Sequence, residues 1–284
     1  MKNLLLLTDF SATADNAVSY GYQLAKEIKA NVLLCNVVDI PAQIPQFETL
    51  VMPLPGYDYS LSDNEKELNK ISERLEHQGP HADFRPVITC IEEAGRLSDV
   101  VTNLTQRHSI DLVIMGIHVN KGIIEWALGN HVNELIDLTK IPVLVIPKNS
   151  RYKKIRKMAL AANHNNKELN AVSLISKLAK KLNAELFLFR VLDDQHGKEE
   201  IMAERGLLTE IKKLTGEVKF SVRTAVNGSV EKQLRSLSKV EHIDLLMMIH
   251  QHKSLLSDLV LGSHSRKMAG ITDLPLLVVP ENIN

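Results

Sequence analysis

The residues best suited to chemistry stand directly after two short apolar runs in the first half of the chain. Asp9 and Ser11 follow the run at residues 4–8, and Gly116 closes the run at residues 111–116. Continuous apolar runs of this length predict strands that are covered on both faces. Ligands of open α/β sheets bind beyond the carboxyl ends of such strands, so a carboxylate, a hydroxyl and a glycine there indicate a small-molecule site.

Gly129 and Asn130 supply a further signal of the same kind. Asn is a favoured N-cap residue, so this pair predicts the start of a helix. The unpaired N–H groups of a helix start attract phosphate, which makes the pair a candidate anion site. Most Gly-Asn pairs at helix starts are plain caps, so the pair alone leaves both interpretations open.

Three histidines in the second half, His250, His252 and His264, have side chains of a type that ligates zinc. The competing interpretation is that they are solvated loop residues, because no cysteine or other fourth ligand accompanies them. Metal binding therefore stays an alternative. Catalysis has no named residues, since neither a nucleophile–base pair nor a P-loop or G-x-G-x-x-G motif occurs.

The composition excludes several classes of protein. The 284 residues carry 34 basic and 34 acidic side chains and only 4% aromatic residues, which argues against nucleic-acid binding. No apolar run approaches the ~20 residues that cross a bilayer, and the N-terminus does not resemble a signal peptide. Cys35 and Cys90 lie in apolar stretches and predict buried thiols in a reducing compartment. We therefore expect a cytoplasmic protein without membrane or nucleic-acid partners.

An internal repeat organises the elements that position these residues. Residues 111–115 resemble 244–248 and residues 141–147 resemble 274–280, each pair 133 positions apart. Near the start of the chain the offset grows by 21 residues, so the first half contains an insertion. We place the boundary of the two domains between residues 148 and 149, giving domains at 1–148 and 149–284 with a basic, polar linker at 148–157.

The insertion, at about residues 40–60, carries four of the ten prolines. Proline removes a backbone donor and fixes φ, so this segment predicts an irregular loop and not an extra strand. It could act as a lid or a docking surface, or it could be a site of free sequence drift, and the residues do not decide between these. Trp126 is interpreted as packing a short helical segment onto the sheet edge, with a partner-binding anchor as the alternative.

Each half alternates strands and helices, which predicts two tandem doubly wound α/β domains, each with a five-stranded parallel sheet flanked by helices. One helix is expected to bury the stripe Ala14, Ala17, Val18, Gly21, Leu24, Ala25 and Ile28, and its repeat the stripe Ala171, Val172, Ile175, Leu178, Ala179 and Leu182. The other strands are expected at residues 31–38, 84–90, 142–146, 158–162, 185–192, 219–224, 244–249 and 275–279.

The order and spacing of these motifs, found twice, resemble the universal stress protein family over essentially the whole chain. The resemblance rests on residues 7–11 (Leu-Thr-Asp-Phe-Ser), 37–39 (Val-Val-Asp), Gly95, 111–116, Leu128-Gly129 and 142–147 (Pro-Val-Leu-Val-Ile-Pro). It implies an adenine-nucleotide alpha-hydrolase-like fold and a role in the stress response. It also implies that the last strands of the two halves, 142–146 and 275–279, pair to form an internal pseudo-dimer. Association of further chains is left open.

The resemblance implies a nucleotide site in the first domain only. ATP-binding members carry G-x-x-G-x9-G-[S/T] after the fourth strand and an Asp after the first strand. Asp9, Gly116, Gly129 and Asn130 match that pattern, and Ser11 and Val38 complete the expected cofactor-binding set. Val119 occupies the second glycine position, and its β-branched side chain resists positive φ and would crowd a phosphate.

The second half departs further from this pattern. Asn163 stands in place of the Asp, Ile249 and His252 replace the first two glycines, and Gly262 and Ser263 remain. A bulky Ile where the backbone must approach a phosphate argues against triphosphate there. The leading hypothesis is a stress-response protein that acts by binding a small molecule or a partner protein. An ATP or ADP switch with slow hydrolysis in the first domain is the alternative.

Overall fold

The computed structural model describes residues 1–38, 57–78, 84–120, 123–126, 135–136, 138–161, 169–192, 213, 216, 218–226, 230–250 and 274–281. The first half contains β1 (Asn3–Thr8), α1 (Ala12–Ile28), β2 (Asn31–Val38), α2 (Tyr57–Glu76), β3 (Ile88–Ala94), α3 (Leu97–His108), β4 (Leu112–Asn120), β5 (Ile123–Trp126) and β6 (Val143–Pro147). The second half contains β7 (Lys157–Ala161), α5 (Leu169–Leu182), β8 (Glu185–Leu192), β9 (Phe220–Val226), α7 (Val230–Val240), β10 (Leu245–His250) and β11 (Leu276–Pro280). No helix within these ranges is long and apolar enough to cross a membrane.

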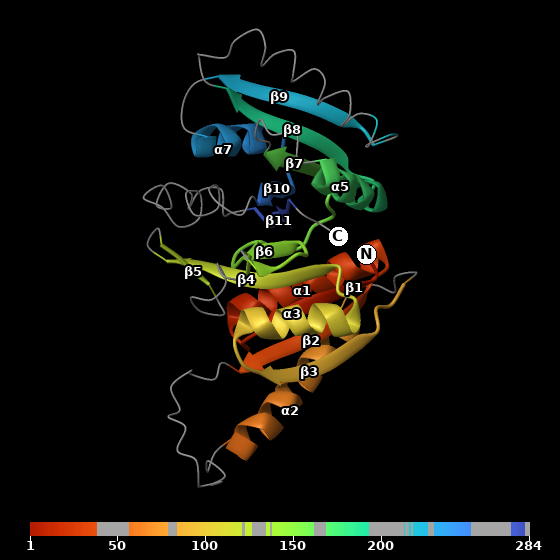
Figure 1. The fold of residues 1–284 in the computed structure, drawn as a ribbon, viewed down its shortest axis with the longest axis vertical. Helices are drawn as coiled ribbons and strands as arrows, with labels where there is room; N and C mark the ends of the chain where they lie inside the picture. The colour runs from red at the N-terminus through yellow and green to blue at the C-terminus, as the bar shows by residue number, and fades with distance from the viewer. Residues whose placement is uncertain are drawn as a thin grey trace.

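One continuous sheet runs through both halves, in the order β3-β2-β1-β4-β6-β11-β10-β7-β8-β9, with β5 attached to β4. The five strands of that order within each half pair in parallel. The two halves meet where β6 and β11 pair antiparallel, with Leu144 opposite Leu277 (Figure 1). The expected doubly wound architecture is confirmed, and the pairing of the last strands agrees with the expected pseudo-dimer.

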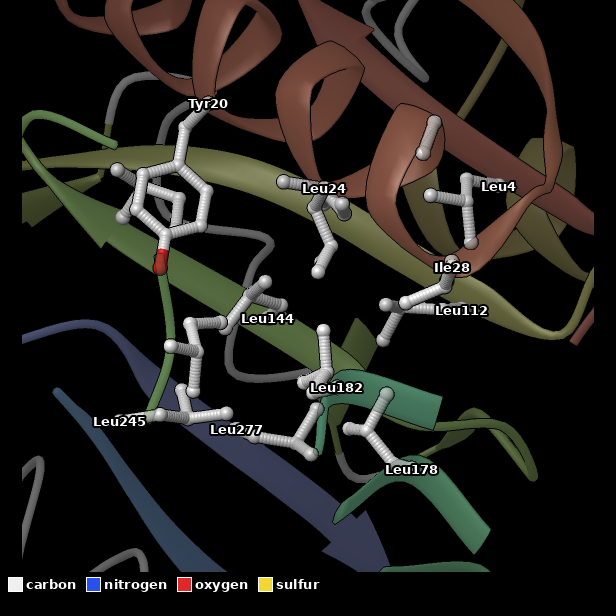
Figure 2. Close-up of a cluster of buried hydrophobic side chains, with 14 of the residues drawn as sticks. Leu4, Tyr20, Leu24, Ile28, Leu112, Leu144, Leu178, Leu182, Leu245 and Leu277 are labelled. Atoms are coloured by element: carbon white, nitrogen blue, oxygen red, sulfur yellow. The ribbon is translucent and has the colours of Figure 1, made fainter. Parts of the chain in front are cut away.

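A single apolar cluster crosses the junction on one face of the sheet. Helices α1 and α5 cover this face, and both predicted stripes are buried along their described lengths. Figure 2 shows Leu24 of α1, Leu144 of β6, Leu277 of β11 and Leu182 of α5 converging on this cluster. Helices α3 and α7 contribute to clusters on the opposite face. The two halves therefore share a core as well as a sheet.

Polar contacts also join the halves. Lys181 of α5 donates from Nζ to the main-chain oxygens of Met1, at 2.9 Å, and Ile28, at 3.2 Å. The Tyr152 ring meets that of Tyr20 edge-on at 4.9 Å between centroids, and its hydroxyl hydrogen-bonds to Glu27. The segment expected to be a polar linker thus packs against α1.

An equivalent aspartate anchors the first strand of each half. Asp111 Oδ2 accepts hydrogen bonds from the main-chain N–H groups of Lys2 and Asn3. Asp244 Oδ2 accepts from those of Arg156, at 2.9 Å, and Lys157, at 3.0 Å. The sequence repeat is therefore also a repeat of contacts.

Most strand boundaries lie within two residues of the predicted ones, and β3 is the main exception. It runs over Ile88–Ala94 and not over residues 84–90, because it pairs along the whole of β2 from Val32 to Val38. Glu92 and Glu93 thus lie within a strand. Strand β3 has no continuous apolar run, because it is the edge of the sheet and its partly exposed carboxylates remain hydrated. Its bounds therefore could not be predicted from apolar residues.

The region after residue 116 also corrects the prediction. Strand β4 continues to Asn120 and forms an antiparallel hairpin with β5, so the backbone at Trp126 is in a strand and not in a helical segment. Ile123 and Ile124 are β-branched and favour that conformation. In the proline-rich insertion, α2 already begins at Tyr57, inside the expected loop, after the last proline of the insertion. Residues 39–56 lie outside the described part of the chain.

Leu144→Ala should destabilise both halves together, because Leu144 is buried in the cluster that they share. We expect the free energy of unfolding to fall by about 2–5 kcal/mol, measured by urea denaturation with circular dichroism. Leu138→Ala removes the same atoms from a side chain that is 55% exposed, and it should change that free energy by less than about 0.5 kcal/mol. Equal effects of the two substitutions would contradict a shared core at the junction.

Candidate functional site

The carboxyl ends of β1, β2 and β4 form one edge of the first half, which we call the carboxyl edge. The order of the strands reverses at β1, because the chain adds β2 on one side of it and β4 on the other. Open α/β sheets bind ligands at such switch points. Asp9 and Ser11 follow β1, Val38 ends β2 and Gly116 lies in β4, so these predicted residues gather at this edge. Gly129 and Asn130 lie outside the described residues.

A tight turn holds Asp9 in place after β1. The buried Thr8 accepts a hydrogen bond on Oγ1 from the N–H of Phe10, at 3.0 Å. Asp9 accepts one on Oδ1 from the N–H of Ser11, also at 3.0 Å. Phe10 between them has φ 63°, a left-handed conformation that non-glycine residues rarely adopt. The Thr8 and Asp9 side chains thus accept the hydrogen bonds that hold a strained turn at the carboxyl edge, directly after β1.

Ser11 serves as the N-cap of α1. Its Oγ accepts a hydrogen bond from the N–H of Ala14 at 3.2 Å, and its backbone has the extended conformation typical of a cap. Ser11, which the sequence predicts to contact a ligand, therefore has a structural role as the residue that starts α1 next to Asp9. The cap places the positive end of the helix dipole at the carboxyl edge, which favours a negative group there.

The Asp9 carboxylate uses only one of its two oxygens in hydrogen bonds among the described residues. Its side chain is only partly buried, and Oδ2 makes no hydrogen bond to any residue in the described part of the chain. An ionised carboxylate oxygen is an acceptor only. The turn therefore presents an oriented acceptor, which suits a ligand that brings hydroxyl or amino donors.

Asn36 is a further candidate residue at the carboxyl edge, and the sequence interpretation missed it. It lies on β2 opposite Thr8, is 5% exposed, and donates from Nδ2 to the Thr8 main-chain oxygen at 2.8 Å. Its Oδ1 is buried and has no hydrogen-bond partner among the described residues. A buried acceptor without a donor costs about 1–3 kcal/mol, so such atoms mark places where a ligand or water donor fits. The signal in the sequence was one Asn inside the apolar run at residues 31–38.

Gly116 is required by packing. A Cβ at this position would lie 2.7 Å from the main-chain oxygen of Thr13 and 2.9 Å from its carbonyl carbon. These are backbone atoms of α1 and cannot rotate away. The glycine that resembles the start of a phosphate motif thus lets α1 approach β4 closely, whether or not a ligand is present.

Val119 lies in an extended strand. It pairs with Ile124 of β5 in the antiparallel hairpin, and His118 pairs with Glu125. A phosphate-wrapping loop needs positive φ values that a strand does not have. The residues present at 116–120 therefore do not fit the loop that holds a triphosphate in the family pattern.

The two cysteines offer no activated thiolate. Cys35 is fully buried in β2. Burial is the main cause that raises the pKa of its thiol to about 12, and the negative charges of the nearby Glu93 and Glu92 add to it. Cys90 lies in the middle of β3 and is only partly buried, which corrects the expectation of two buried thiols. Burial also raises its pKa. A protonated thiol is a poor nucleophile.

The second half differs at the equivalent positions. Arg190 of β8 stands where the repeat places Asn36, and it is only 4% exposed. The sequence interpretation did not single out this buried guanidinium. Among the proposed metal ligands, the backbone of His250 ends β10, while His252 and His264 fall outside the described residues. Within the described ranges no group of three His, Cys, Asp or Glu residues could hold a metal ion.

Comparison with known proteins covers both halves. The model of the Universal stress protein family matches residues 1–147 and 154–280. A universal stress protein of Methanocaldococcus jannaschii is 27% identical over 154 residues, which are 51% of this chain and 94% of that protein. One of Synechocystis sp. is 25% identical over 291 residues, covering 98% of this chain and 99% of the relative. The crystal structure of a universal stress protein from Archaeoglobus fulgidus has a TM-score of 0.73 at 16% identity, covering 99% and 98% of the two chains.

Gly116→Ala should destabilise the protein in the absence of any ligand, because the new methyl group would overlap the Thr13 carbonyl. We expect the free energy of unfolding to fall by about 1–3 kcal/mol, measured in urea without nucleotide. If the glycine served only the approach of a ligand, the unliganded variant would unfold like the wild type.

Proposed function

The chain belongs to the universal stress protein family, and we propose that it is a stress-response protein that acts by binding an adenine nucleoside or nucleotide in its first half. The observation that carries the proposal is the Asp9 turn at the switch point, where Oδ1 is used to hold the turn and Oδ2 faces no protein donor among the described residues.

The chemistry of the carboxyl edge supports a nucleoside. Asp9 Oδ2 and the neighbouring Asn36 Oδ1 are both acceptors, so the ligand they suit must supply donors. Ribose hydroxyl groups and the amino group of adenine are such donors. The Ser11-capped start of α1 lies beside them and would favour one phosphate.

The hairpin of β4 and β5 restricts how many phosphate groups of a nucleotide the site can hold. In the family pattern the second glycine lets the backbone curve around the phosphates, and here Val119 is held in the ladder opposite Ile124. A nucleoside or its monophosphate therefore suits the site better than ATP does. Binding is confined to the first half in this proposal, because Asn163 and Arg190 stand where Asp9 and Asn36 stand.

Binding and not turnover is the proposed activity. Within the described residues the carboxyl edge holds one carboxylate and a serine that is engaged as a helix cap, and no base is positioned beside a nucleophile. ATP hydrolysis would need a group that activates water. In this proposal the protein acts through its ligand-bound state, which other proteins recognise.

Asp9→Asn should weaken nucleoside and nucleotide binding at least tenfold. Asn can retain the turn through its carbonyl oxygen, but it replaces the second acceptor with an NH₂ donor that repels the ligand's donors. Isothermal titration with adenosine, AMP, ADP and ATP in the presence of Mg²⁺ measures the effect. Asp63→Asn makes the same change on the exposed face of α2, where Asp63 pairs with Lys66, and should bind like the wild type. Unchanged affinity in Asp9→Asn would overturn the proposed site.

Val119→Gly should change the preference among nucleotides. Glycine weakens the β4–β5 ladder and permits positive φ, so a loop able to wrap phosphates becomes accessible. We expect the affinity for ATP to rise relative to that for AMP, while adenosine binds as before. A ratio that does not move would show that the hairpin is not what limits the phosphate chain.

A further inference from the structure

A groove lies between α2 and the outer edge of β3, away from the carboxyl edge. Its volume is about 580 Å³, within the range of sites that bind ligands. One wall is the stripe Glu65, Leu68, Asn69 and Ser72 of α2, and the other is residues 88–92 of β3. Figure 1 shows β3 as the outermost strand of the first half, with α2 beside it.

The main chain of β3 has hydrogen-bonding groups on its outer edge that pair with no strand in the described part of the chain. Val32 N–H donates to Val87 O and Gly95 N–H donates to Val38 O, each at 2.9 Å. In a parallel pair the main-chain groups of alternate residues face the same neighbour, so odd-numbered residues from 87 to 95 face β2. The N–H and C=O groups of Ile88, Cys90 and Glu92 consequently face outward. No described strand pairs with them.

The walls of the groove have a definite chemical order. The Leu68 side chain is buried in the core, and Ile88 and Cys90 pack against that core while remaining partly exposed. Cys90 Sγ lies 3.7 Å from the Leu68 main-chain oxygen. Glu65 and Glu92 line the same groove, and Asn64 donates to Glu92 Oε1 at 2.7 Å, which fixes that carboxylate. The groove thus offers the partly exposed Ile88 and Cys90 side chains on β3, with the Glu65 and Glu92 carboxylates toward the start of α2. No basic residue is among the described residues that line it.

From this geometry we propose that β3 and α2 bind an extended peptide segment of a partner protein that carries a basic residue next to apolar ones. The segment adds to β3 as a further strand, and its main chain pairs with Ile88, Cys90 and Glu92. Its apolar side chains pack on the partly buried Ile88 and Cys90, and its basic side chain meets Glu65 and Glu92. The five lining residues of β3 span about 17 Å, which matches a segment of about five residues.

The probe is a peptide labelled with fluorescein at its N-terminus, fluorescein-Thr-Val-Thr-Arg-Thr-Val-Thr-amide, and its analogue with Glu in place of Arg. On the full chain we expect saturable binding of the Arg peptide and weaker binding of the Glu peptide, by fluorescence anisotropy. Hydrogen exchange resolved by residue should slow at the outward N–H groups of Cys90 and Glu92. Inward N–H groups, such as that of Ile91, should change little. The peptide should also slow the modification of Cys90 by a thiol reagent.

Two variants test the two walls separately. Glu65→Lys should weaken the Arg peptide about fivefold or more and favour the Glu peptide, whereas Glu67→Lys, the same change on another face of α2, should not. Cys90→Pro removes one outward N–H donor, which an edge strand tolerates, and should abolish binding. Cys90→Ala keeps that donor and should still bind. If Cys90→Pro does not fold, the charge variants and the exchange data still decide.

Three results would overturn the proposal. The first is an Arg peptide that does not saturate at millimolar concentration. The second is binding that leaves the Cys90 and Glu92 amides unchanged. The third is self-association through β3, seen by sedimentation as a dimer that Cys90→Pro disrupts, which would assign the edge to a second copy of the chain. None of these outcomes depends on whether the first half binds a nucleoside.

Discussion

The antiparallel pairing of β6 with β11 is the contact on which the rest of the molecule depends. Parallel strands must be covered on both faces, and each half alone would leave its last strand as an uncovered edge. By pairing these strands, with Leu144 opposite Leu277, the chain turns two sheets into one and lets α1 and α5 share an apolar cluster. The exposed edges of the sheet are thereby moved to β3 and β9, far from the junction.

The two halves keep the same frame while their chemistry diverges. Asp111 and Asp244 make equivalent main-chain contacts, so the folding constraints of the repeat are preserved in both halves. At the carboxyl edge, in contrast, a neutral Asn36 in one half corresponds to a buried Arg190 in the other. Both positions are buried, so the same frame accommodates an amide in one half and a guanidinium in the other.

The sequence was enough to predict the elements that follow from apolar periodicity. It was not enough to predict the features that depend on contact with a distant segment of the chain. Both helical stripes and the buried strands follow from apolar spacing, and the position of Asp9 follows from the end of β1. The bounds of β3 were not predicted because Glu92 and Glu93 lie on an edge strand, where charged side chains are tolerated. The hairpin at Val119 was not predicted because pairing with β5 determines its conformation. The packing role of Gly116 could not be predicted either, because a sequence does not show that Thr13 would meet a Cβ at this position.

Helix α1 touches both the Asp9 turn and the other half of the molecule. It starts at the Ser11 cap beside Asp9 and runs for 17 residues, about 25 Å, to a C-terminal end where Lys181 of α5 binds the Ile28 carbonyl. A helix behaves as a stiff rod over such a length. The Asp9 turn and the contact with α5 are therefore the two ends of one rigid element, and a displacement at one end of α1 would also displace the other.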